Sequence, residues 1–440
     1  MLKLFNTLLK LTDTVLFIKK LIVLFLGILL IQSCVTTKNR ALKKELSISL
    51  DTDVFDDSFT GFMLYNPKTR DTIYSHNTNK YFTPASNTKI FTLYTSLKLL
   101  PDSIPTLKYL IENDTLYIEG TGDPSLLHTY YKDSSSVLFL KQHKNIAFHF
   151  NNFKEDTFGP GWAWEDYDWY YSPERSVLPI YGNVTTIFKA DSLTVTPDYF
   201  KNKVAEILAE KNRAPNTNDF FFEPTREDTL EVPFIVNPLL TKELFERVIQ
   251  NKISVVHEMP EGNKKTLYSI PSDSLYKRMM HQSDNFIAEQ LLILGSTSLS
   301  DTLNSAIARE YILENDLSNL AQQPKWVDGS GLSRYNLFSP ESIVDVLNRL
   351  YTEIPKERLF QLFPAAGVDG TLKDRYKGNP LPYIYAKSGS LGNNYCLSGY
   401  LITTSGEILI FSFMNNHFKK PTDEVRMQMQ TIFEYIRDTY

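Results

Sequence analysis

The chain has 440 residues, of which 42% are hydrophobic and 22% charged, so it can bury a large core and form two or three domains. Its net charge of -5 leaves no basic excess, and no cluster of lysines and arginines is interleaved with aromatic residues. Because nucleic-acid-binding surfaces are basic, we expect no nucleic-acid partner.

The N-terminus has the features of an export signal. Two lysines precede an apolar run over residues 21–31, which is long enough for a signal-peptide core and too short to span a membrane. The run ends in Ile-Gln-Ser-Cys, which resembles the lipobox of bacterial lipoproteins and implies lipidation of Cys34. We expect residues 1–34 to be a lipoprotein signal peptide and residues 35–46 a polar tether. A plain signal peptide with an incidental cysteine is the alternative.

The cysteines predict a domain without disulfides. The chain has two of them, and if Cys34 carries lipid, Cys396 has no partner. An exported domain of this size can be stable without a disulfide because its core suffices. Cys396 stands in an apolar, strand-like run, which predicts a buried and unreactive thiol.

The first part of the domain predicts a hairpin, then a helix, then an insertion. Residues 59–65 and 72–75 are β-rich runs separated by an Asn-Pro-Lys turn signal. A helix begins near Ser86, and its apolar residues recur with a 3.6-residue period, which predicts one buried face. After this helix, short β-rich runs alternate with turns rich in Asp, Asn, Gly and Pro. We interpret residues 105–233 as an inserted β-rich region.

Helical patterns return after the insertion. The predicted helices cover residues 240–251, 272–281, 286–294 and 302–314. A further helix begins at Ser339, a capping residue followed by proline at the first helical position. The predicted strands of a closing meander cover residues 383–386, 395–404 and 407–415. A final amphipathic helix follows, and we expect the opening hairpin and the closing strands to form one sheet.

Ser86 and Lys89 stand three residues apart at the start of a predicted helix, so their side chains can meet. A serine hydroxyl becomes nucleophilic when a base lies within hydrogen-bond reach, and a desolvated lysine can be that base. A Ser-x-x-Lys pair alone is a weak signal, since Ser274 and Lys277 form a second one. We interpret that second pair as structural.

Two further short motifs follow Ser86 in the chain. Ser283 and Asn285 belong to a Ser-Asp-Asn sequence between two predicted helices, and Lys387 begins a Lys-Ser-Gly sequence at the end of a predicted strand. Ser75-His76-Asn77 also fits Ser-x-Asn, but it precedes Ser86 and is set aside. The ordered motifs Ser-x-x-Lys, Ser-Asp-Asn and Lys-Ser-Gly resemble the signature of penicillin-binding proteins and serine β-lactamases.

More closely, the chain resembles the D-alanyl-D-alanine carboxypeptidase/endopeptidase family of class C penicillin-binding proteins, the serine peptidase family S13. The long separation between Ser86 and Ser283 leaves room for the inserted domains of that family. Segments that resemble its other motifs cover residues 120–126, 161–166, 328–333 and 366–372. The resemblance implies an α+β transpeptidase fold, an antiparallel sheet flanked by helices, in residues 47–104 and 234–440, with the large β-rich insertion between them.

The resemblance also implies a catalytic role for each motif residue. Ser86 would be the acylated nucleophile and Lys89 the base that takes its proton. Ser283 would relay a proton to the leaving amine, and Asn285 would hydrogen-bond the peptide carbonyl of the substrate.

The Lys-Ser-Gly motif would bind the substrate's terminal carboxylate. Lys387 and Ser388 would recognise that carboxylate, and the charge of Lys387 would depress the pKa of the base. Ser388 stands where threonine is commoner in the family, and either hydroxyl can serve. Gly389 and Ser390 complete the predicted binding segment, with the backbone N–H of Ser390 and that of the nucleophile forming the oxyanion hole.

The implied activity is the cutting of D-Ala-D-Ala ends, or of D-Ala-containing cross-links, in peptidoglycan stem peptides through an acyl-enzyme that β-lactams also form. The implied location is the bacterial cell envelope, facing the periplasm, with a lipid anchor in the membrane. A β-lactamase or esterase on the same fold is one alternative, although the deacylating glutamate of class A enzymes has no convincing match. A non-catalytic peptidoglycan-binding scaffold is another. We expect no cofactor and no metal, since His143 and His149 lack ligand spacing.

The insertion contains a group of aromatic residues: Trp162, Trp164, Tyr167, Trp169, Tyr170 and Tyr171. They could line a groove for glycan or peptide, but we interpret them as a core cluster. Asp123 and Asp328 are interpreted as caps of turns.

Overall fold

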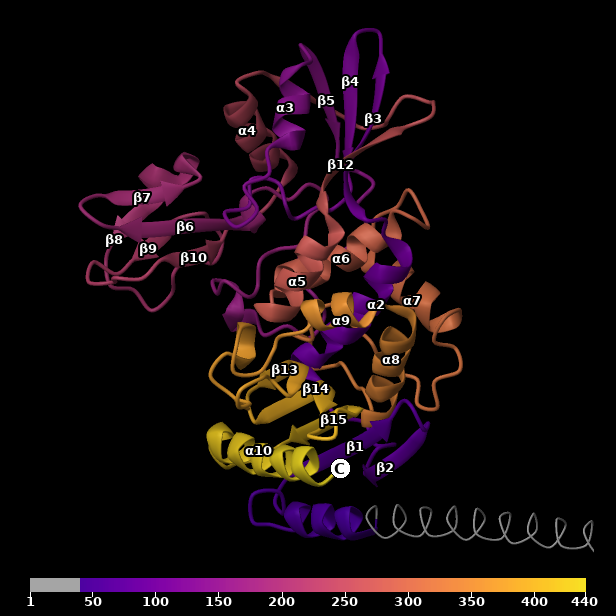
Figure 1. Ribbon diagram of the computed structural model, residues 1–440. Coiled ribbons are helices and arrows are strands. Elements are labelled where there is room, and N and C mark those ends of the chain that lie inside the picture. Colours follow the sequence, from indigo (N-terminus) through magenta and orange to yellow (C-terminus); the bar gives the residue numbers. More distant parts are fainter. Residues whose placement is uncertain (1–39) are drawn as a thin grey trace, which may run out of the picture.

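The computed structural model describes residues 40–440, which form a lower body around the main sheet and an upper body built from the insertion (Figure 1). The predicted signal peptide, its Cys34 and the first part of the predicted tether lie outside the described residues. Within the described residues, no helix is long and apolar enough to cross a membrane.

The main sheet has five antiparallel strands in the order β13-β14-β15-β1-β2. Their bounds are β1 (Phe59–Asn66), β2 (Asp71–His76), β13 (Ile384–Leu391), β14 (Asn394–Ile402) and β15 (Ile408–Asn416). Phe62 of β1 pairs with Phe413 of β15, so the opening hairpin and the closing meander form one sheet, as predicted. Cys396 in β14 is buried. Burial raises the pKa of its thiol to about 12, which agrees with an unreactive cysteine.

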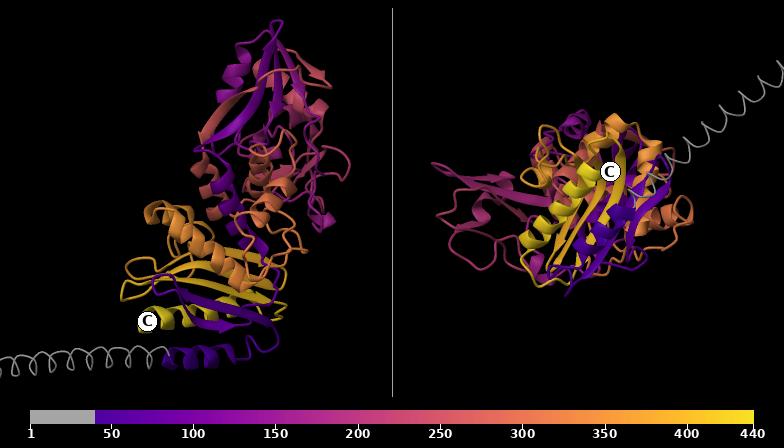
Figure 2. Two further views of the ribbon diagram at one scale, coloured as in Figure 1. Left: turned by 90° about the vertical axis from the view of Figure 1, so that its right-hand side faces the viewer. Right: turned by 60° about the horizontal axis from the view of Figure 1, so that its bottom comes forward.

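One face of this sheet is covered by α10 (Thr422–Thr439), whose five buried apolar residues recur at helical spacing. The same core contains Leu42, Leu46 and Leu50, which lie on a helix over residues 40–50. Figure 2 shows this helix and α10 on the side of the sheet away from the insertion. The predicted tether is therefore wrong for residues 40–46, because leucines four residues apart give that segment an apolar stripe that packs on the domain.

The helices of the lower body lie on the other side of the sheet. They are α2 (Lys89–Leu99), α5 (Ser272–His281), α6 (Asn285–Ser296), α7 (Ser305–Glu314), α8 (Pro340–Glu353) and α9 (Lys356–Leu362). Of these, α8 packs directly on β1, β14 and β15. Ser339 caps α8 as predicted, since its hydroxyl accepts from the N–H of Ser342. The burial of α2 extends beyond the one face that the sequence predicts. Residues 89–96 are all buried, because α5, α6, α7 and α8 surround this helix.

The insertion contains a second five-stranded sheet, in the order β11-β5-β4-β3-β12, and two smaller sheets. Its strands are β3 (Ser103–Glu112), β4 (Thr115–Gly120), β5 (Asn145–His149), β6 (Val184–Lys189), β7 (Leu193–Thr196), β8 (Val204–Glu206), β9 (Phe220–Phe222), β10 (Leu230–Pro233), β11 (Ile253–Val256) and β12 (Lys265–Pro271). Its helices are α3 (Ser135–Lys141) and α4 (Pro238–Ile249).

The structure moves the end of the insertion beyond the predicted residue 233. Strands β11 and β12 form both edges of the inserted sheet. Leu244 and Phe245 of α4 share a core with Leu116 and Phe148 of that sheet. The chain therefore returns to the lower body at α5, directly after β12.

Candidate active site

Ser86 lies in a 3₁₀ turn over Ala85–Thr88, and Lys89 is the first residue of α2. The amine Nζ of Lys89 donates to Ser86 Oγ at 2.9 Å, to Asn285 Oδ1 at 2.7 Å and to the carbonyl oxygen of Ser330 at 2.6 Å. The last two partners are carbonyl oxygens and have no proton to give. Once the ammonium loses a proton, the Ser86 hydroxyl alone among these three partners can donate to it, which is the geometry a general base needs.

Burial controls the protonation of this lysine. It lowers the pKa of Lys89 to about 8, while the negative charges of Asp328, Glu289 and Asp284 oppose that shift. The sequence-based prediction named both desolvation and the charge of Lys387, and burial is the cause that lowers the pKa of Lys89 in the structure. Lys387 is itself fully buried. Burial and the charge of Lys89 together hold the pKa of Lys387 well below its usual range.

Lys387 and Ser283 form the opposite wall of the site. The Nζ of Lys387 donates to Ser283 Oγ at 2.9 Å and to the carbonyl oxygen of Ser388 at 2.7 Å. Ser283 has a φ of 56°, a left-handed conformation that non-glycine residues seldom adopt. The turn directs Ser283 and Asn285 to the buried lysines, whereas Asp284 between them caps α6 by accepting from the N–H of Ile287 at 3.0 Å.

Strand β13 passes directly over the turn that carries the serine. A Cβ on Gly389 would lie 2.6 Å from the carbonyl oxygen of Pro84 and 2.9 Å from the nitrogen of Ser86, so only glycine permits this approach. The side-chain amide of Asn87 donates to the carbonyl oxygen of Lys387 at 2.9 Å. This contact ties the turn to the strand and fixes the serine against the Lys-Ser-Gly motif.

These residues open into a cavity of about 870 Å³, whose lining includes Ser86, Ser283, Asn285, Ser388 and Ser390. This volume is in the range of pockets that hold small ligands. Four arginines and four carboxylates also line the cavity: Arg278, Arg334, Arg375, Arg426, Glu165, Asp166, Glu231 and Asp284. Within residues 40–440, no group of three or more His, Cys, Asp or Glu side chains is placed to hold a metal ion.

The aromatic residues of the insertion do not form the core cluster that we predicted. Trp164, Trp169 and Tyr170 are 75%, 46% and 61% exposed, whereas Tyr167 is buried. Trp169 stacks on Tyr171, with ring centroids 6.1 Å apart. This pair is not part of a common aromatic core. Tyr170 and Tyr171 line the cavity, and the carbonyl oxygen of Tyr171 accepts from the amide of Asn285 at 2.9 Å.

Asp123 and Asp328 cap turns, as predicted. Asp123 accepts from the N–H of Ser125 at 2.8 Å, and Asp328 accepts from the N–H groups of Gly331 and Ser333 at 2.9 and 2.6 Å. Gly331 has a φ of 83°, and a Cβ there would lie 1.9 Å from the carbonyl oxygen of Ala85. The loop beginning at Asp328 is therefore pressed against the turn that carries the nucleophile.

Several site residues were missed by sequence reasoning. A main-chain acceptor such as the carbonyl of Ser330 leaves no signal in the sequence. Glu289 and Gln290 do leave one, because they interrupt the apolar run of α6 and are fully buried there. Such residues need polar partners. Gln290 finds them in the carbonyl oxygens of Gly122 and Ser176, at 2.7 and 2.8 Å, which joins α6 to the insertion.

Comparisons with known proteins identify a family and similar sequences. The family model described as "D-Ala-D-Ala carboxypeptidase 3 (S13) family" matches residues 42–209 and 236–435. A D-alanyl-D-alanine carboxypeptidase of Haemophilus influenzae is 24% identical over 452 aligned residues, which cover 88% of this chain and 91% of the relative.

Solved structures show the same fold. The crystal structure of penicillin-binding protein 4 from Haemophilus influenzae has a TM-score of 0.68 and 21% identity, and the match covers 87% of this chain and 96% of that one. A structure of the same protein complexed with a β-lactam has a TM-score of 0.61 at the same identity and coverage. The α+β transpeptidase fold predicted from the motifs is thereby confirmed.

Proposed function

The chain belongs to the D-Ala-D-Ala carboxypeptidase 3 (S13) family, and we propose that Ser86 and Lys89 are the nucleophile and base of this serine-type carboxypeptidase. The observation that carries the proposal is the contact between the Lys89 amine and the Ser86 hydroxyl, since the other two partners of that amine have no proton to give. Substrates would be D-Ala-terminated or D-Ala-cross-linked peptidoglycan stem peptides.

In the proposed acylation step, Ser86 Oγ attacks the carbonyl carbon of the penultimate D-Ala while Lys89 takes the hydroxyl proton. The negative oxygen of the tetrahedral intermediate would be held by the backbone N–H groups of Ser86 and Ser390. As the C–N bond breaks, the leaving nitrogen must gain a proton. Ser283 would relay it, and the contact of its Oγ with Nζ of Lys387 at 2.9 Å supports this role. D-Ala departs, and water then hydrolyses the ester on Ser86.

The remaining motif residues would position the substrate. Lys387 and Ser388 would bind the terminal carboxylate, whose negative charge favours the protonated lysine. Asn285 is held between Lys89 and the carbonyl of Tyr171, so its amide can meet the substrate backbone without rearranging. β-Lactams would acylate Ser86 in the same way, consistent with the β-lactam complex of the structurally similar protein.

For the location of the enzyme, we propose a bacterial cell envelope, with Cys34 lipidated and the protein facing the periplasm. The apolar run before Cys34 and its lipobox resemblance support this. The helix over residues 40–50 packs on the face of the main sheet opposite the insertion (Figure 2). An anchor that precedes this helix would hold that face toward the membrane and leave the insertion directed away from it.

Incubation with a fluorescent penicillin should label one peptide, the one that contains Ser86. The S86A variant should lose the label, while S274A, altered in the second Ser-x-x-Lys sequence, should retain it. Peptide mapping after digestion of folded protein makes the measurement. Label elsewhere, or none on the wild type, would refute the proposed nucleophile.

Rapid turnover of a chromogenic cephalosporin would favour a β-lactamase, whereas a persistent adduct favours the peptidase.

The pH dependence of acylation should follow the protonation of Lys89. Only the neutral amine can accept the Ser86 proton, and burial lowers the pKa of Lys89 to about 8. The rate should therefore rise about tenfold per pH unit below about pH 8 and level off above it. Labelling kinetics between about pH 6 and about pH 10 give the profile. A rate that stays constant through the acid range would contradict a lysine base.

A further inference from the structure

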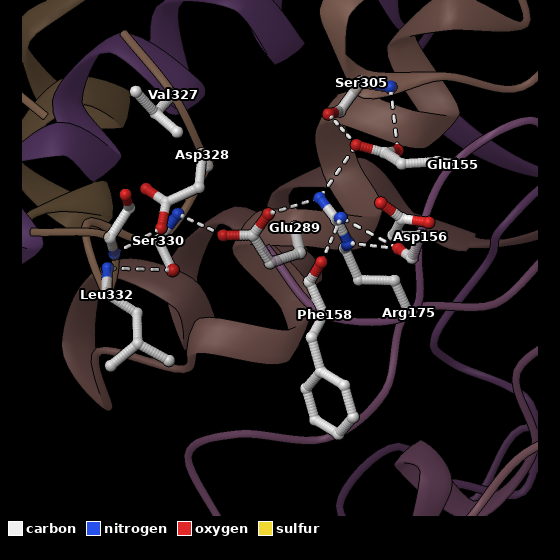
Figure 3. Close-up of polar contacts among 12 residues, drawn as sticks. Glu155, Asp156, Phe158, Arg175, Glu289, Ser305, Val327, Asp328, Ser330 and Leu332 are labelled. Carbon is white, nitrogen blue, oxygen red and sulfur yellow. Dashed lines mark hydrogen bonds and ion pairs between the residues drawn. The ribbon is translucent and has the colours of Figure 1, made fainter. Parts of the chain in front are cut away.

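A second buried charge stands directly behind the base. Glu289 and Lys89 are both fully buried, and the backbone of Ser330 lies between them. Oε1 of Glu289 accepts from the N–H of Ser330 at 2.7 Å, and the carbonyl oxygen of Ser330 accepts from Nζ of Lys89 at 2.6 Å. Figure 3 shows the carboxylate of Glu289 directed at Ser330 on one side and at Arg175 on the other. One residue thus links the carboxylate to the base.

The loop that contains Ser330 has little room to adjust. A Cβ on Gly329 would lie 2.4 Å from the carbonyl oxygen of Ala288 in α6, and one on Gly331 would lie 1.9 Å from that of Ala85. The loop is therefore wedged between α6 and the turn that carries the nucleophile. A shift of Ser330 would move the acceptor that holds the base.

The carboxylate of Glu289 is only partly compensated. Its Oε2 has no hydrogen-bond partner and lies 3.6 Å from Nη1 of Arg175, a guanidinium that is also bonded to Glu155 at 2.8 Å. Burial and the charge of Asp328 raise the pKa of Glu289 to about 7, against the lowering effect of Arg175. Burying a carboxylate is costly, so a residue of the same shape without charge would serve packing better.

We propose that Glu289 is a positioning residue for the base: through Ser330 it fixes where Lys89 is held, and its negative charge sets how readily Lys89 gives up its proton. The inference rests on the proposed function of Lys89. It explains why a carboxylate is buried within the largely apolar helix α6.

Removal of the charge of Glu289 should change the pKa of Lys89 in a definite direction. Lys89 is surrounded by the carboxylates of Glu289, Asp328 and Asp284, which raise its pKa against the effect of burial, and by the second buried lysine, Lys387. Glu289 itself interacts with the guanidinium groups of Arg175 and Arg309. These other groups remain in place in an E289Q variant. Loss of one negative charge should then lower the pKa of Lys89, so that the base becomes neutral at lower pH.

The test compares three variants by the kinetics of fluorescent-penicillin labelling across pH. E289Q keeps an acceptor for Ser330, so we expect much of the rate to remain and the acid limb of the profile to move to lower pH. E289A removes the acceptor, and its labelling rate should fall at least tenfold. E155Q is the matched control, because it removes a charge bonded to Arg175 without touching Ser330, and it should keep the wild-type profile.

Two outcomes would overturn the inference: an E289Q profile that does not move, or an equal shift in E155Q. If E289A fails to fold by circular dichroism, the nearly isosteric E289Q and its control still decide. Wild-type labelling at Ser86 separates this test from the proposed function. If the wild type is not labelled, the proposed function fails. If it is labelled and all variants match it, the role of Glu289 alone fails.

Discussion

Replacement of Lys89 by alanine is expected to reduce acylation of Ser86 by about 10²–10⁴-fold, the usual contribution of a general base. The amine of Lys89 is bonded to the Ser86 hydroxyl at 2.9 Å. The matched control is K277A, which alters the lysine of the other Ser-x-x-Lys sequence. Lys277 is exposed, and its loss should leave the rate unchanged. Labelling rates of the two variants against wild type make the measurement.

Thermal unfolding separates a catalytic from a structural role for this lysine. K89A leaves Asn285 Oδ1 and the carbonyl of Ser330 without their donor, at a cost of about 1–3 kcal/mol for each unsatisfied group. It also removes an amine whose burial is unfavourable, which offsets part of that cost. The melting temperature should therefore change little compared with the rate. An unfolded K89A, or one that is acylated at the wild-type rate, would contradict the assignment.

The family resemblance of the three short motifs was sufficient to identify which distant residues meet. Ser86 and Ser283 lie far apart in the chain and line one cavity, and Lys387 hydrogen-bonds Ser283 beside it. The ordered motifs implied this meeting through their resemblance to the penicillin-binding-protein signature. The main sheet was also predictable, since an opening hairpin and closing strands flank a helical middle and can therefore form one sheet. Strong local patterns thus predicted the parts of the fold that position the site.

Other features depended on tertiary context. Strand β11 lies parallel to β5, and nothing in its four residues specifies that partner, so the sequence does not reveal that the insertion extends beyond residue 233. Leu42, Leu46 and Leu50 do form a helical stripe, but the polar residues around them were read as a tether. The protonation of Lys89 depends on how deeply it is buried, which no motif encodes.

The second large effect is expected at the other buried lysine. K387A should reduce D-Ala release by about 10²–10³-fold, comparable to the loss of one preorganised electrostatic donor. Nζ of Lys387 is bonded to Ser283 Oγ at 2.9 Å, and the proposed path carries a proton through this contact. K373A removes an exposed lysine two residues from Thr371, whose hydroxyl contacts that of Ser388 in β13, and should leave D-Ala release unchanged. Assays of released D-Ala make the comparison.

A double-mutant cycle tests whether Lys387 and Ser283 act as a unit. If both are needed on one proton path, the K387A/S283A double variant should lose about as much activity as the more severe single variant. Losses that multiply would show that the two residues act independently.

The terminal carboxylate of the substrate should determine which of the two buried lysines carries charge. In the free enzyme, burial disfavours charge on both Lys387 and Lys89, and the charge of Lys89 further disfavours charge on Lys387. A carboxylate bound beside Lys387 would favour the proton there, and the repulsion would then keep Lys89 neutral and able to accept the proton of Ser86. K387A should therefore harm cleavage of a D-Ala-D-Ala peptide more than cleavage of its C-terminal amide. If K387A loses equal activity on both substrates, Lys387 acts in proton transfer and not in recognition of the carboxylate.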